Sequence, residues 1–170
     1  HALIPHAMPA PAAITGLIEK YRESLPHVAE GAAAIRRIRA DFIEPFLKSL
    51  GWDAEPSGGH AKRGRSGIRD VPFRIRGQPR QIDYVLCTPK GGVIAIATPD
   101  PTANEEAALD LRRYAWNSGM DLAILTNFGR SMLFDARVPV RPGDDATTAL
   151  IAAVTCDQYA EIWDPIVALF

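Results

Sequence analysis

Apolar residues recur at helical spacing in four parts of the chain. The pattern predicts helices over residues 14–24, 32–50, 104–118 and 157–170. Gly51 and Gly119 follow two of these stretches, as glycine often does where a helix ends. Pro45 lies inside the second stretch. Because proline lacks a backbone N–H, we expect it to kink that helix or to split it in two.

Shorter apolar or alternating runs predict strands, at residues 71–76, 82–87, 93–98, 122–126 and 131–135. The second and third are joined by Pro89-Lys90-Gly91-Gly92, which predicts a hairpin. The fourth is wholly apolar and is expected to be buried on both faces, whereas residues 137–145 are predicted to be a loop. This order of elements predicts an α/β domain with a mixed central β-sheet flanked by helices.

Composition bounds the class of protein. A chain of 170 residues suits one domain, and a net charge of -1 excludes a uniformly basic nucleic-acid binder but not a local basic patch. Cys87 and Cys156 are the only cysteines, so neither a disulfide framework nor a cysteine zinc site is expected. The chain has no apolar run long enough to span a bilayer. We therefore expect a cytoplasmic protein with no membrane contact.

The first 12 residues are set apart by their composition. Pro5, Pro9 and Pro11 interrupt them and no basic residues precede the apolar part, so they do not form a signal peptide. We expect residues 1–12 to be disordered or vector-derived, with Met8 as a candidate native start. Residues 13–170 are then predicted to form a single domain, which would be a fragment or the N-terminal part of a larger protein.

Residues 55–81 form a basic, glycine-rich segment. Only Glu55 and Asp70 are acidic there, against the basic residues Lys62, Arg63, Arg65, Arg69, Arg74, Arg76 and Arg80. Two interpretations stand. Lys62, Arg63 and Arg65 could contact DNA phosphates, which contributes affinity without sequence choice. Alternatively, the segment is a solvated loop whose charges balance acidic residues elsewhere.

The predicted hairpin holds a lone aspartate. Residues two apart in a strand share a face, so Val93, Ala95 and Ala97 face one way. Asp83 lies near the start of the partner strand and is expected beside the far end of the alanine-bearing strand. From local sequence alone, the simpler interpretation is that Asp83 caps a turn or pairs with an arginine.

Four stretches together resemble a nuclease family. They are RADFIEPFLKSLGWD (39–53), IDYVL (82–86), LRRYAWNSGMDLAILTNFGRSMLFD (111–135) and YAEIWDPIVALF (159–170). In order and spacing they resemble the N-terminal nuclease domain of type I restriction R subunits and the related domain of combined restriction-methylation enzymes. The resemblance implies the restriction-endonuclease-like fold of the PD-(D/E)xK nucleases and endodeoxyribonuclease chemistry that depends on Mg²⁺.

In that family an aspartate and a glutamate bind Mg²⁺, which activates water, and a lysine two residues past the glutamate offsets developing charge. The resemblance places Asp83 at the metal-binding aspartate. It places Ala95 at the glutamate and Ala97 at the lysine, with Ile96 between them able to offer only its backbone carbonyl to the metal. The glutamate and the lysine of the family are therefore both absent. Mg²⁺ is expected to bind weakly or not at all, and the chain is not expected to cut DNA.

Two further positions depart from the family pattern. Many relatives carry a glutamate where this chain has Ile35, and a glutamine where it has Asp110. Asp110 could serve as an accessory polar group together with Arg113, or be a solvated helix residue. The alanine pair fits engineering of a toxic nuclease, whereas Ile35 and Asp110 fit natural decay, and both explanations stay open.

The leading hypothesis is a DNA-cleavage-type domain of a restriction or phage-defence system. Its expected partners are double-stranded DNA and the motor, methyltransferase or target-recognition regions that position such a domain. A dimer is also plausible, since cutting both strands usually needs two such domains. The alternative is a natural pseudo-nuclease that binds DNA or a partner protein, and a third option is an unrelated α/β binding module.

Overall fold

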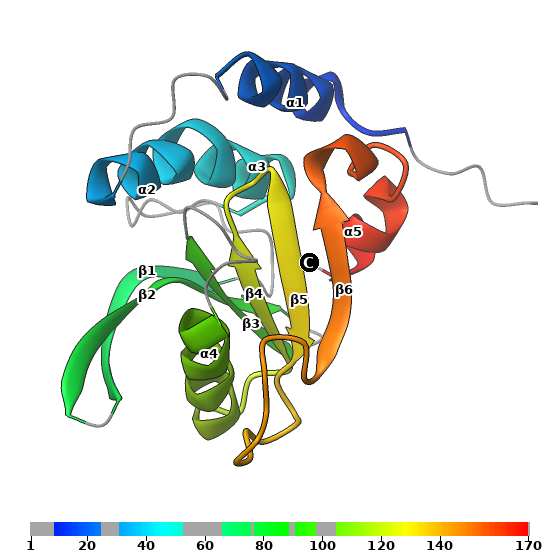
Figure 1. Ribbon diagram of the computed structural model, residues 1–170. Coiled ribbons are helices and arrows are strands. Elements are labelled where there is room, and N and C mark those ends of the chain that lie inside the picture. Colours follow the sequence, from blue (N-terminus) through cyan, green and yellow to red (C-terminus); the bar gives the residue numbers. More distant parts are fainter. Residues whose placement is uncertain are drawn as a thin grey trace, which may run out of the picture.

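Six strands form one sheet whose order follows the chain (Figure 1). The computed structural model describes residues 9–24, 31–52, 66–75, 77–88, 91–97 and 105–169. The strands are β1 (Ser66–Ile75), β2 (Gln78–Thr88), β3 (Gly91–Ala97), β4 (Leu122–Thr126), β5 (Arg130–Asp135) and β6 (Leu150–Thr155). Neighbours are antiparallel except β3 and β4, whose parallel pairing joins two antiparallel three-stranded halves. The predicted α/β class is confirmed.

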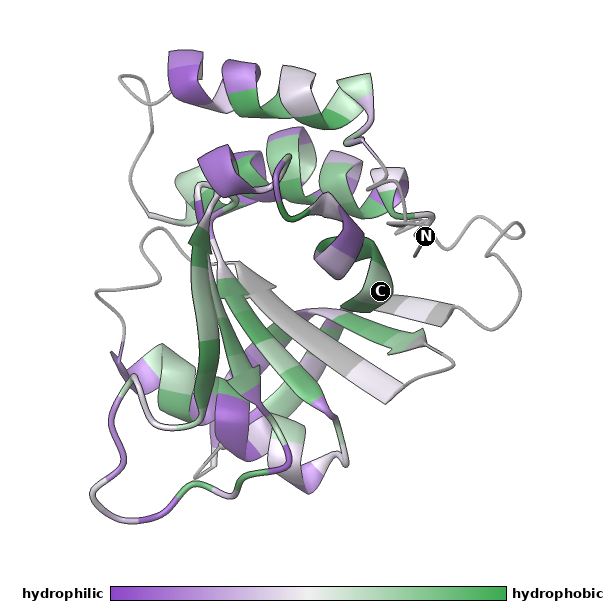
Figure 2. Ribbon diagram, turned by 90° about the vertical axis from the view of Figure 1, so that its right-hand side faces the viewer, coloured by the Kyte–Doolittle hydropathy of each residue, from purple (hydrophilic) through white to green (hydrophobic). Residues whose placement is uncertain are grey.

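Helices cover both faces of this sheet (Figure 1). One face carries α1 (Ala12–Ser24), α2 (Ala32–Ile38), α3 (Glu44–Ser49) and α5 (Trp163–Leu169), and the other carries α4 (Glu105–Asn117). Hydrophobic residues dominate the central strands, shown in green in Figure 2. Within the described ranges, no helix combines the length and the apolarity that a membrane crossing requires.

Each face has its own core. On the α1–α3 side, aromatic rings pack together, with Phe42 stacked on Phe128 at a centroid distance of 5.4 Å and Tyr21 edge-on to Phe42 at 5.2 Å. On the other side, Leu111 of α4 packs in a buried cluster with Leu125 of β4, and both side chains are 0% exposed. All five residues of β4 are buried, which confirms the prediction for that strand.

The helical run around Pro45 shows how the chain accommodates a proline. A π-helical turn (Arg39–Ile43) lies between α2 and α3, and Pro45 occupies the first turn of α3. A proline ring collides with the carbonyl four residues earlier and has no N–H to donate to it. The wider turn gives the backbone room at that point, so the run divides into two helices, which is one of the two predicted outcomes. The turn begins at Arg39, which reaches the sheet.

Three predictions about local structure need correction. The predicted helix over 157–170 is a short 3₁₀ turn (Cys156–Gln158) followed by turns and the brief α5, because Pro165 cannot donate a helical hydrogen bond. Strand β6 was not predicted, although it supplies the pairing partner that β5 needs. Strand β1 confirms the strand predicted within the basic segment, but β1 and β2 reach further into it than predicted, so its described part is a hairpin rather than the solvated loop of one interpretation.

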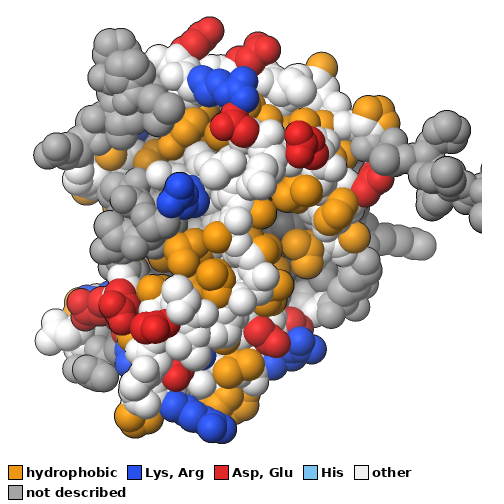
Figure 3. Space-filling model, turned by 45° about the vertical axis from the view of Figure 1, so that its right-hand side comes forward, with side chains coloured by type: hydrophobic (Ala, Val, Ile, Leu, Met, Phe, Trp, Pro, Cys, Tyr) orange, Lys and Arg blue, Asp and Glu red, His pale blue; other side chains and the backbone are white. Residues whose placement is uncertain are grey.

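An apolar pocket of about 370 Å³ opens between α3, α5 and strands β4–β6. Hydrophobic side chains gather on the face that includes β6 and α5, as Figure 3 shows. Ile151 at its lining is 59% exposed and Leu169 is 40% exposed. Thr126, Ser131 and Tyr159 lie in the same lining, but their hydroxyl groups bond to one another at 2.7 and 2.9 Å.

Candidate functional site

Asp83 lies buried on β2, with 7% of its surface exposed. One oxygen of its carboxylate, Oδ1, is 2.9 Å from Nη1 of Arg39, which projects from the start of the π-helical turn. Asp83 therefore pairs with an arginine, as the simpler interpretation of the sequence expected. Its assignment as a metal ligand stays a prediction.

Arg39 binds a second carboxylate and a phenol. Its Nη2 is 2.8 Å from Oδ1 of Asp70 on β1, and its Nε donates to the hydroxyl of Tyr84 at 3.2 Å. The guanidinium also lies over the Tyr84 ring, 5.0 Å from its centroid, and the Tyr84 hydroxyl donates to Glu44 at 3.1 Å. Five side chains from two helical segments and two strands thus form one polar network.

Burial and hydrogen bonding oppose each other in this network. Burial disfavours the charged form of Arg39, but its bonds to Tyr84 and Asp70 outweigh that effect and raise the pKa of Arg39 above its usual range. Burial also raises the pKa of Tyr84, and the charge of Arg39 only partly offsets this. Arg39 therefore stays cationic and Tyr84 stays a neutral donor at physiological pH.

A local irregularity in β1 and β2 brings the two aspartates to the same arginine. The ladder pairs Arg69 with Tyr84 and Val71 with Ile82, so Asp70 lies opposite Asp83. Asp70 has a φ of 58°, a left-handed conformation that aspartate tolerates better than most residues. Regular alternation would place Ile82 and Tyr84 on one face of the sheet, yet they belong to the cores on opposite faces. The strand pair is therefore distorted at the aspartates.

The register of β3 places the alanine positions beside this network. Ala95 pairs with Tyr84 on one side and with Ile124 on the other, and Ala97 pairs with Thr126. Position 95 is thus opposite the residue that follows Asp83, which confirms the expected juxtaposition of the two strands. An alanine side chain carries no atom that could bind a metal or a phosphate.

The residues present do not fit an Mg²⁺ site. Mg²⁺ requires oxygen ligands in near-octahedral geometry, but the carboxylates of Asp70 and Asp83 both already bind Arg39. Positions 95 and 97 add no side-chain oxygen. In the part of the chain that the structure describes, no group of three or more His, Cys, Asp or Glu residues could hold a metal ion.

The predicted accessory pair is located on α4. Asp110 is 8% exposed and its carboxylate is 2.8 Å from Arg113 and 3.8 Å from Arg80 of β2. These three residues line a pocket of about 510 Å³ between the hairpin and α4, together with Glu105, Glu106, Leu109 and Gln78. Asp110 is thus buried and paired, so the interpretation of a solvated helix residue is wrong. The accessory role of Asp110 and Arg113 stays a prediction.

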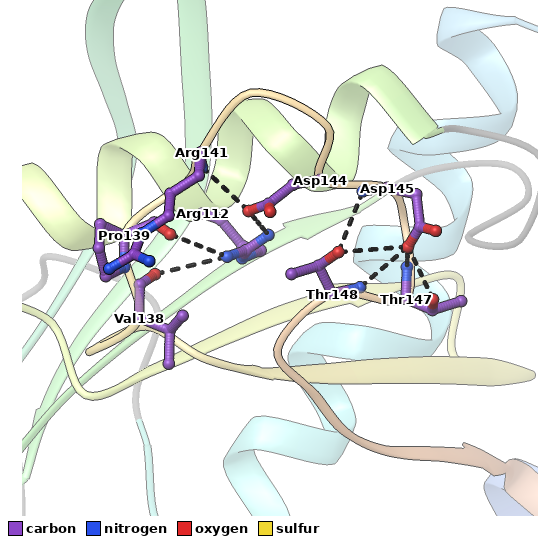
Figure 4. Close-up of polar contacts among 8 residues, drawn as sticks. All are labelled: Arg112, Val138, Pro139, Arg141, Asp144, Asp145, Thr147 and Thr148. Carbon is purple, nitrogen blue, oxygen red and sulfur yellow. Dashed lines mark hydrogen bonds and ion pairs between the residues drawn. The ribbon is translucent and has the colours of Figure 1, made fainter.

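Arg112 also differs from expectation. We expect it on the helix surface, but its side chain is 0% exposed and ion-paired to Asp144 at 3.2 Å (Figure 4). The loop that follows β5 covers this side of α4, which the sequence of α4 alone does not reveal. Ile35 packs against the core on the α1–α3 side. Lys62, Arg63 and Arg65 lie outside the described residues.

Comparison with known proteins adds one relation. The chain is similar to the type II restriction enzyme and methyltransferase RM.Eco57I of Escherichia coli, with 22% identity over 156 residues, covering 88% of this chain. The match covers 16% of that protein, so the chain spans about a sixth of the relative's length. No family model matches, and no solved structure matches. The chain is therefore distantly similar to one region of a combined restriction and methylation enzyme.

Proposed function

We propose that residues 13–170 form a restriction-endonuclease-like domain of a cytoplasmic restriction or phage-defence system, and that this domain does not cut DNA. The observation that carries the proposal is the similarity over 88% of the chain to a restriction enzyme and methyltransferase. The register adds support, because Asp83 and position 95 lie on neighbouring strands, one residue apart in the ladder. That is where the nuclease family places its aspartate and its glutamate.

The loss of cleavage follows from chemistry at three positions. Asp83 is bound by Arg39, and Ala95 and Ala97 supply neither the carboxylate nor the ammonium group of the nuclease reaction. When neither a metal nor a lysine ammonium group lies beside the scissile phosphate, the transition state for attack by water lacks its main electrostatic stabilisation. The proposed partners are double-stranded DNA and the motor, methyltransferase or target-recognition regions of the same system. Paired recruitment on DNA could bring two copies together.

The test is incubation of the chain with supercoiled plasmid and Mg²⁺ or Mn²⁺. We expect no metal-dependent nicking above the background of a mock purification, and reproducible nicking would contradict the proposal. The variant Ala95→Glu with Ala97→Lys restores the family side chains, and Ala95→Gln with Ala97→Gln is its uncharged control. Cleavage by the first but not by the second would show that only these two groups were lost.

The alternative function is that of a natural pseudo-nuclease that binds DNA or a partner protein. The observation that favours it is the ion pairing of Asp83, since a buried, paired carboxylate suits a structural role better than a catalytic one. Fluorescence anisotropy with labelled duplex DNA at several salt concentrations tests binding. If Lys62, Arg63 and Arg65 contact phosphates, neutralising all three flattens the slope of log affinity against log salt by about 0.9 per contact. An unchanged slope would exclude these contacts.

The origin of the alanines has its own test. The genomic sequence that encodes this chain decides between the two explanations. Glutamate and lysine codons at positions 95 and 97 indicate an engineered nuclease, whereas alanine codons indicate a natural pseudo-nuclease.

A further inference from the structure

Arg39 occupies the space between two carboxylates that face each other across β1 and β2. Its two terminal nitrogens lie 2.8 Å from Asp70 and 2.9 Å from Asp83. The side chains of Arg39 and Asp83 are only 15% and 10% exposed, while that of Asp70 is 46% exposed. A single cation thus bridges the two acids, and it is largely withdrawn from water.

The surroundings hold Arg39 in this position from other directions as well. Its Nε donates to Tyr84 at 3.2 Å and its guanidinium lies over the Tyr84 ring. Tyr84 is in turn anchored by its hydrogen bond to Glu44, in the first turn of α3. The backbone of Arg39 begins the π-helical turn that precedes Pro45. The placement of the guanidinium is therefore built into the helix as well as the sheet.

A divalent metal and the guanidinium would compete for the same oxygens. A metal bound by Asp70 and Asp83 would lie within a few ångströms of a fixed positive charge, and the poorly exposed carboxylate of Asp83 cannot turn to water to avoid this. Arginine presents a planar fork that fits carboxylates and does not lose its proton in proteins. The existing arrangement therefore already binds both acids and offsets one of their two negative charges without a metal.

We infer that Arg39 is the resident cation of this site and that it excludes divalent metals from the Asp70–Asp83 pair. The inference rests on the proposed function and extends it, because it assigns the exclusion of metal to a residue other than the two alanines. Restoring the glutamate and lysine side chains at positions 95 and 97 would leave Arg39 bound to the two aspartates.

The experiment measures Mn²⁺ binding by electron paramagnetic resonance to the whole chain and its variants. We expect the unmodified chain and Asp83→Asn to bind Mn²⁺ equally weakly. Arg39→Met removes the bridging charge and should bind Mn²⁺ at least about tenfold more tightly, since the guanidinium then no longer competes with the metal for the two carboxylates. Adding Asp83→Asn to Arg39→Met should abolish the gain.

Two controls keep the result interpretable. Arg37→Met is the matched control, because Arg37 lies two residues earlier and pairs with the more exposed Asp41 at 3.4 Å, so this change should not create tight Mn²⁺ binding. Circular dichroism checks that Arg39→Met folds. If it does not fold, the comparison of the unmodified chain with Asp83→Asn can still overturn the inference. Tighter Mn²⁺ binding by the unmodified chain than by Asp83→Asn would overturn the inference, as would a folded Arg39→Met that gains no affinity.

The outcomes separate this inference from the proposed function. Mn²⁺ bound through Asp83 without plasmid nicking would overturn the role of Arg39 and leave the inactive nuclease-type domain standing. Absence of any DNA or partner binding, together with no Mn²⁺ bound through Asp83, would count against the proposed function and leave the role of Arg39 intact.

Discussion

Replacing Arg112 with methionine should destabilise the protein strongly. The side chain of Arg112 is 0% exposed, and its Nη1 pairs with Asp144 at 3.2 Å. Its Nη2 donates two long hydrogen bonds, at 3.5 and 3.4 Å, to the carbonyls of Val138 and Pro139 (Figure 4). Methionine has a similar length but no charge, so the change leaves Asp144 and the loop carbonyls without this donor.

The expected cost can be placed within a range. Removing one partner of a buried ion pair typically costs about 3–5 kcal/mol of the free energy of unfolding. The lower end applies here for two reasons. Asp144 keeps a hydrogen bond from the backbone N–H of Arg141 at 3.0 Å, and Nε of Arg112 has no hydrogen-bond partner among the described residues, so it already carries a desolvation cost. We therefore expect a loss of about 3 kcal/mol, which lowers Tm by about 6–12 °C in a chain of this size.

The measurement is urea unfolding followed by circular dichroism, with Arg137→Met as the matched control. Arg137 pairs with Asp135 at 2.9 Å, but its side chain is 71% exposed, so its loss should cost less than about 1 kcal/mol. Asp144→Ala and the double variant complete a cycle in which the coupling energy should reach about 1–3 kcal/mol. Equal stability losses for Arg112→Met and Arg137→Met, or an additive cycle, would refute the reasoning.

Three further predictions concern the core and the thiols. Gly129→Ala places a methyl group against the ring and hydroxyl of the buried Tyr21, and we expect a loss of about 1–3 kcal/mol in the free energy of unfolding measured with urea, whereas a neutral effect would contradict the packing described. Cys87 is exposed, whereas Cys156 is buried and its burial raises the pKa of its thiol. Iodoacetamide at mildly alkaline pH should therefore label Cys87 first, and it should label Cys156 only after urea is added. Mass spectrometry checks this order. Tyr159→Phe removes a hydroxyl that donates to the buried backbone carbonyl of Phe128 at 2.6 Å, and we expect the free energy of unfolding to fall by about 1–3 kcal/mol. An unchanged Tm in thermal unfolding would contradict this prediction.

The local sequence pattern predicted those helices and strands whose own residues determine their secondary structure. The apolar run of β4 forms a buried strand within the predicted bounds, and the described part of the periodic run forms the helix α4, which ends one residue before the predicted end. Strand β6 escaped prediction because its small apolar residues carry a weak pattern, and the open edge of β5 provides the pairing that makes it a strand. The C-terminal helix was predicted too long because apolar spacing outweighed the effect of Pro165.

The candidate site divides in a similar way. The sequence determined that Asp83 has no carboxylate or lysine partner at positions 95 and 97, because those residue types can be read directly. The tertiary structure alone decided that Asp83 meets Arg39, 44 positions earlier in the chain, and that Asp70 shares the same guanidinium. Such contacts depend on strand register and on how helices pack across a sheet, which residues distant in sequence settle together. For the same reason Arg112 is a buried anchor rather than a surface residue, since the loop that covers it comes from another part of the chain.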